Sequence, residues 1–222
     1  MSNEKDLLSA ANKGDSNAMY DLAFHYQDQG NIKEAVYWWE ESAKKGDEYG
    51  SKNAIIYQCD PTLGKSSQEF FDCIKRHAVD YNFGWAKIVL GALFCGEAHA
   101  FWKNYFNIND FTSYINFDQG FKLIEEGVSL MGKSEINLNR WDYMAIKTAY
   151  LNHKDEISEI RTVPYLKKAL EYLHKEIELV PDDDFETKAI LKGQVEVTNE
   201  QIKATLKAEA SFNEFQKKYF RN

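Results

Sequence analysis

Apolar residues near the start of the chain recur every three or four positions, which is the spacing of an amphipathic helix. One stripe is formed by Ala18, Leu22, Ala23 and Tyr26. A second stripe is formed by Ala35, Trp38, Ser42 and Ala43. The pair Gly30-Asn31, which favours a turn, separates them. The pattern predicts two helices joined by a tight turn, with the second ending at Gly46.

The same periodicity predicts helices along the rest of the chain. Their expected ranges are about 3–14, 47–57, 66–78, 83–97, 117–131, 139–153, 163–179 and 184–193. A capping box, Ser66-x-x-Glu69, opens one of them, and Thr198-x-x-Gln201 is expected to open a last helix. No segment shows the strict alternation of a strand, so the predicted fold class is all-α.

Parts of the helical pattern repeat. The tripeptide Lys13-Gly14-Asp15 returns as Lys45-Gly46-Asp47, and the positions of Ala86, Leu90, Gly91 and Phe94 restate the first stripe 68 residues later. The pattern resembles the Sel1-like repeat, a relative of the tetratricopeptide repeat. This resemblance implies a right-handed α-α superhelix of helix-turn-helix repeats, in which Trp38 and Trp39 pack in helix interfaces.

The resemblance divides the chain into two parts. Residues 1–132 are expected to form the repeats, and residues 133–222 a divergent set of C-terminal helices. An aromatic insertion at about 98–116 interrupts the repeats, and it includes Phe101, Trp102, Tyr105, Phe106, Phe111 and Tyr114. Such rings either anchor a partner at the binding edge or fold back to cover a helix face, and the sequence leaves both interpretations open.

Charge and composition narrow the classes of partner. The 222 residues carry a formal net charge of −8, which disfavours binding to nucleic acid or anionic membranes and favours a basic protein or peptide. No apolar run is long enough for a membrane span, and the charged N-terminus does not resemble a signal peptide. Three cysteines are few and odd in number, which suits a reducing compartment, so we expect a cytoplasmic protein.

Two pairs of residues have the spacing of metal ligands on a helix. Cys73 precedes His77 by four positions, and Cys95 precedes His99 by four. Together they offer four ligands to a tetrahedral zinc ion, but buried cysteines in helix interfaces with partly exposed histidines are the simpler explanation. We therefore expect no metal and no cofactor, with these four residues as the candidates if one binds. A cysteine nucleophile lacks a local signature, and the doublet Glu40-Glu41 is interpreted as a solvated helix face.

Resemblance to Sel1-like proteins implies binding without catalysis. We expect an adaptor, regulatory or immunity-type protein of bacterial type, whose partner is a protein or peptide of unspecified identity. The expected contact residues are Tyr20 and His25 on the first helix of the repeat, together with Phe101, Trp102, Tyr105 and Phe106 in the insertion. The alternatives are a metal-dependent protein or enzyme that uses the Cys/His cluster, and a structural oligomer; the oligomeric state is not specified by the sequence.

Overall fold

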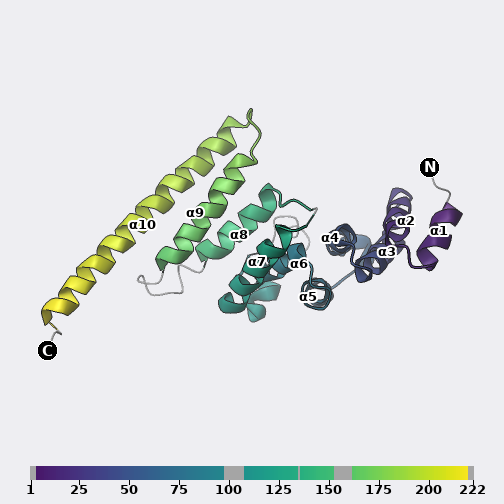
Figure 1. Ribbon diagram of the computed structural model, residues 1–222, viewed down its shortest axis with the longest axis horizontal. Helices are drawn as coiled ribbons and strands as arrows, with labels where there is room; N and C mark the ends of the chain where they lie inside the picture. Colours follow the sequence, from purple (N-terminus) through teal and green to yellow (C-terminus); the bar gives the residue numbers. More distant parts are fainter. Residues whose placement is uncertain (1–3, 98–107, 135, 153–161, 220–222) are drawn as a thin grey trace. The chain divides into compact units, whose positions relative to one another are not determined.

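The computed structural model describes residues 4–97, 108–134, 136–152 and 162–219, and all regular structure in these ranges is helical (Figure 1). The predicted all-α class is therefore confirmed for this part of the chain. Within the same ranges, none of the helices combines the length and the apolar character needed to cross a lipid bilayer.

The helices follow the predicted order closely. The α-helices are α1 (Glu4–Asn12), α2 (Ser16–Asp28), α3 (Ile32–Lys44), α4 (Glu48–Tyr57), α5 (Ser67–Lys75), α6 (Gly84–Phe94), α7 (Phe117–Met131), α8 (Arg140–Asn152), α9 (Thr162–Glu178) and α10 (Phe185–Tyr219). The shorter segments are the 3-10 helices η1 (Pro61–Leu63) and η3 (Ile108–Tyr114), and the π-helical turn η2 (Arg76–Asp80).

The chain separates into two compact units. The first holds residues 1–94 and 98–137, and the second holds residues 95–97 and 138–222. The sequence predicted that the repeats end at residue 132, which lies at the end of α7. The main part of the second unit begins at Leu138, just before α8.

The recurring Lys-Gly-Asp tripeptide has a local physical explanation. Gly14 and Gly46 have φ angles of +94° and +97°, a left-handed conformation that ends a helix at little steric cost for glycine. The next residue caps the following helix: Asp15 accepts backbone N–H groups at the start of α2, and Asp47 does so at the start of α4. The tripeptide therefore joins the end of one helix to the start of the next.

Aromatic packing holds α2, α3 and α4 together. Trp38 and Trp39 are both buried, as predicted. The Trp39 ring stacks on Tyr57 with centroids 4.7 Å apart and meets the ring of Phe24 edge-on at 5.4 Å. Rings of this size contribute much of the apolar burial in the small core at this end of the unit.

Glycines set the spacing of α6 and α7, which lie side by side (Figure 1). A Cβ atom built on Gly91 would lie 2.6 Å from the carbonyl oxygen of Gly120, and one on Gly127 would lie 2.6 Å from that of Gly84. Both distances are below van der Waals contact, so the two backbones approach closely because these side chains are absent.

The described end of the aromatic insertion packs against α5. Phe111 is buried and approaches Phe70, with ring centroids 6.5 Å apart. Tyr114 stacks on Phe71 at 4.0 Å. These two rings therefore cover a helix face, which is the second of the two interpretations that the sequence left open for the insertion.

The predicted break before the last helix is wrong. In the second unit α9 packs against both α8 and α10, and α10 runs without interruption through Thr198. The Thr198 hydroxyl donates to the carbonyl of Gln194, one turn earlier, instead of capping a new helix. The chain near Thr198 contains no proline that would break the helix. Gly193 destabilises the helix by only about 1 kcal/mol relative to alanine, and burial against α9 outweighs this cost.

Candidate functional site

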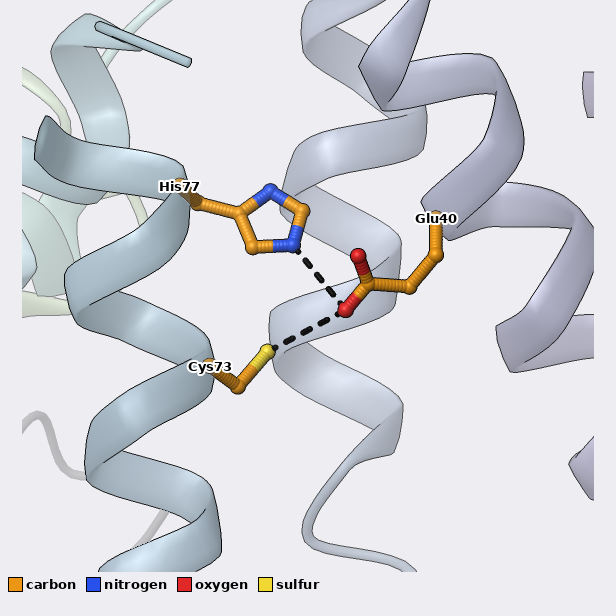
Figure 2. A group of neighbouring side chains, drawn as sticks. All are labelled: Glu40, Cys73 and His77. Atoms are coloured by element: carbon orange, nitrogen blue, oxygen red, sulfur yellow. Dashed lines mark hydrogen bonds and ion pairs between the residues drawn. The ribbon is translucent and has the colours of Figure 1, made fainter. Parts of the chain in front are cut away.

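Three side chains with metal-ligating atoms meet inside the first unit. Glu40 projects from α3, and Cys73 and His77 project toward it from α5 and the turn that follows (Figure 2). Four positions apart on a helical segment, Cys73 and His77 share one face. The helix predicted to run to residue 78 changes at Arg76 into the π-helical turn η2, a feature frequent at functional sites.

One carboxylate oxygen is the common point of the cluster. Glu40 Oε1 accepts a hydrogen bond from Arg76 Nη2 at 2.7 Å and a longer one from Cys73 Sγ at 3.5 Å. The same oxygen lies 3.2 Å from His77 Nε2. The Glu40 side chain is 12% exposed, so most of its charge is compensated by these neighbours and not by water.

His77 is held from its other side by α4. Its Nδ1 lies 2.9 Å from Ser51 Oγ, within hydrogen-bonding distance. The imidazole is fully buried, and the Tyr81 ring meets it edge-on with centroids 5.0 Å apart. Among the described residues, Nε2 has no aligned hydrogen-bond partner, although it lies close to Glu40.

The surroundings fix the charge states of two members of the cluster. Burial raises the pKa of the Glu40 carboxyl, but the contacts with His77 and Arg76 outweigh it and lower the pKa to about 2. Burial and the nearby Glu40 carboxylate raise the pKa of the Cys73 thiol well above its usual value. Glu40 is therefore ionised and the Cys73 thiol protonated at neutral pH, a state that does not favour Cys73 as a nucleophile.

A groove of about 910 Å³ lies beside this cluster. Ile32, Lys33, Val36 and Tyr37 of α3 line one wall. The segment after α4 contributes Leu63 and Lys65, and Glu40, Arg76 and Tyr81 bring the polar cluster to the groove. Glu40 and Arg76 therefore belong both to the buried cluster and to the lining of the groove.

The residues that the sequence proposed for partner binding lie elsewhere or outside the described ranges. Tyr20 packs against Phe24 and Tyr49 on α2 and α4, and His25 Nε2 lies 3.1 Å from Glu4 Oε2. Neither residue lines the groove. Phe101, Trp102, Tyr105 and Phe106 lie outside the described residues, as does His99.

The metal candidates are only partly brought together. Cys73 and His77 are neighbours, but the third donor beside them is Glu40; among the described residues, Cys95 is not a member of this group. Burial raises the pKa of the Cys95 thiol to about 12. The interpretation of Glu40 as part of a solvated face is wrong, because Cys73, Arg76 and His77 surround its carboxylate. Glu40 lies four positions after Val36 and three before Ala43, which are both buried, and this spacing was the available signal.

Comparison of the chain with protein-family models, with curated proteins and with solved structures finds no match in any of the three. The resemblance to Sel1-like repeats therefore stays a prediction from the residues.

Proposed function

We propose that the protein acts without catalysis, by binding a peptide segment of a protein partner in the groove along α3. The observation that supports this proposal is the groove itself, about 910 Å³ in volume, which is large enough for several side chains. It combines an apolar wall with charged groups, and such a mixture provides both affinity and orientation.

The lining of the groove specifies the chemistry of the segment. Tyr37 is 53% exposed and, with Val36 and Leu63, offers an apolar surface for an anchoring side chain. Four basic side chains line the groove, namely Lys33, Lys44, Lys65 and Arg76. Arg76, Lys44 and Lys65 pair with Glu40, Glu41 and Glu69, so among the described residues Lys33 is the lining cation without an ion pair. Although the net charge of the chain favours a basic partner, the groove suits a segment with an apolar anchor and a carboxylate.

The wider architecture in this proposal is a short Sel1-like superhelix. The helix pairs α2–α3, α4–α5 and α6–α7 would be successive repeats, and the capped Lys-Gly-Asp junctions support that succession. A protein of this kind would serve as a cytoplasmic adaptor, regulator or immunity-type binder of bacterial type. Its groove would then provide the contact with the partner.

The proposal is tested by selecting a displayed library of random peptides on the full chain. Selected peptides are expected to combine an aromatic or branched apolar residue with at least one Asp or Glu. Their affinities are then measured by fluorescence polarisation for the wild type and for Tyr37→Ala with Lys33→Glu. We expect at least about a 30-fold loss, because an anchor contact and a charge contact are removed together.

Two further variants serve as controls for the peptide-binding test. Trp141→Ala removes a comparably exposed aromatic ring, 48% exposed, from the second unit and should leave peptide binding unchanged. A variant with Trp102→Ala and Tyr105→Ala tests the insertion as the binding edge. Peptides that lose affinity only in the insertion variant, or a library without enrichment, would contradict the groove as the binding site.

A further inference from the structure

The cluster formed by Glu40, Cys73 and His77 offers oxygen, sulfur and nitrogen atoms, a set that suits a metal ion of intermediate softness. We propose that Glu40, Cys73 and His77 bind Zn²⁺ through one carboxylate oxygen, the Cys73 sulfur and His77 Nε2. Oxygen, sulfur and imidazole nitrogen are all ordinary zinc ligands. Three protein ligands leave a fourth position, which would take water or a group from a bound segment.

The distances between the ligand atoms fit this ion. In a tetrahedral zinc site, bonds of about 2.0–2.3 Å separate the ligand atoms by roughly 3.3–3.8 Å. Glu40 Oε1 already lies 3.2 Å from His77 Nε2 and 3.5 Å from Cys73 Sγ, and the three ligand atoms all lie within 4.8 Å of one another. Binding needs side-chain adjustments within the cluster, and Arg76 must release the carboxylate oxygen to which it donates.

His77 supplies a second, independent observation. Its Nε2 is fully buried, points toward the cluster (Figure 2) and has no aligned hydrogen-bond partner among the described residues. The 3.2 Å contact with Glu40 Oε1 is an ion pair only if the imidazole is protonated. In a neutral imidazole, the lone pair of Nε2 is available to a metal ion. The contact of Nδ1 with Ser51 Oγ is the type of supporting contact that orients histidine ligands in metal sites.

Two features of the site determine how binding proceeds. Zinc binding through Cys73 forms a Zn–S bond in place of the S–H bond and releases the thiol proton to solvent. Arg76 competes with the ion, because its Nη2 donates to the oxygen that would ligate zinc. The Arg76 side chain is 40% exposed and lines the groove, so it has room to withdraw.

The test measures metal binding directly on the full chain, stripped of metal with a chelator. Zn²⁺ affinity is measured against a chromogenic indicator, and Co²⁺ is added in a parallel experiment to detect a thiolate-to-cobalt charge-transfer band. We expect one Zn²⁺ per chain and a cobalt band that is lost in Cys73→Ala. Zinc affinity should fall roughly 10–100-fold in Ser51→Ala and further in Cys73→Ala.

Arg76→Ala and Cys95→Ala distinguish a metal site from a purely structural cluster. Arg76→Ala removes the competing cation and should bind zinc more tightly than the wild type. Cys95→Ala removes a buried cysteine that is not in the cluster and should leave both readouts unchanged. Cys73→Ser, close in shape, replaces Cys73→Ala if circular dichroism shows that the alanine variant is unfolded.

The proposal is overturned if the wild type gives no cobalt band, if Cys73→Ala keeps it, or if Cys95→Ala abolishes it. None of these measurements uses a peptide, so failure of the zinc proposal leaves the proposed groove function untouched, and the reverse also holds.

Discussion

In each unit of the molecule, positive or hydrogen-donating groups surround a largely buried glutamate. In the first unit, Glu40 contacts Arg76, His77 and Cys73. In the second unit, Glu176 accepts from Lys147 at 2.9 Å and lies 3.7 Å from Arg140 Nε. The Glu176 side chain is only 2% exposed, compared with 12% for Glu40. In both clusters, neighbouring groups compensate the charge of a carboxylate that is largely removed from water.

The two clusters differ in the chemistry of the partners. Ammonium and guanidinium groups donate hydrogen bonds and have no lone pair to offer, so the Glu176 cluster can only be an ion pair. The partners of Glu40 include sulfur and imidazole nitrogen, which can become ligands, and its cluster borders a groove. Similar compensation of charge therefore serves stability in one unit and leaves a chemical function open in the other.

The largest effect is expected from Glu176→Gln. This change removes the negative partner that the described residues give the buried Lys147 ammonium, and leaves it the neutral Gln194 Oε1, 3.2 Å away. We expect the free energy of unfolding of the second unit to fall by about 3–5 kcal/mol, measured by urea denaturation. The matched control, Glu176→Leu with Lys147→Met, removes both charges and should recover most of the loss. A loss below about 1 kcal/mol in Glu176→Gln would mean that the Glu176 cluster stabilises the fold no more than the Glu40 cluster does.

A smaller and pH-dependent effect is expected from Glu40→Gln. Because the folded state lowers the pKa of Glu40 from 4.5 to about 2, the ionised carboxylate stabilises the fold above pH 4.5. This contribution is at most about 3 kcal/mol and is lost as the pH falls from 4.5 through 2.

The measurement for Glu40→Gln is urea denaturation of the wild type and the variant at pH 7, 5, 4 and 3. The difference in unfolding free energy should shrink steadily below pH 4.5, since other carboxylates titrate equally in both proteins. A difference that does not vary with pH would mean that the folded state does not depend on the Glu40 charge.

The smallest effect is expected from Glu171→Gln, which removes one partner of an ion pair on the surface of α9. Glu171 and Lys175 are four positions apart, and Lys175 Nζ lies 3.0 Å from Glu171 Oε1. Their side chains are 47% and 37% exposed. Water and salt screen such a pair, so the unfolding free energy should change by at most about 0.5 kcal/mol. A loss as large as that of Glu40→Gln would show that burial is not what separates the clusters from ordinary surface pairs.

Helix positions were largely predictable because they depend on neighbouring residues. The capping box at Ser66 is present, and the helix predicted at 117–131 has those bounds in α7. Where prediction failed, the local signal was weak or was outweighed. The Thr198 motif did not start a helix because α10 gains more from packing on α9 than a new cap would provide.

The candidate site was only half predictable. The pairing of Cys73 with His77 follows from their spacing on one helix. Glu40 lies 33 residues before Cys73 on another helix, and its role depends on how α3 packs against α5. Helical phase on one segment does not encode the distance to an oxygen on another, and a single sequence carries no other record of that contact.

The sequence by itself determined the helical class, the order of the helices and most of their ends, because periodicity, caps and glycine turns act within a few residues of one another. Only the tertiary structure decided which charges are buried together, where the groove lies and that Cys73 and His77 meet at Glu40. Those features depend on contacts between helices distant in the chain, where burial removes water and makes the partners of each charge decisive.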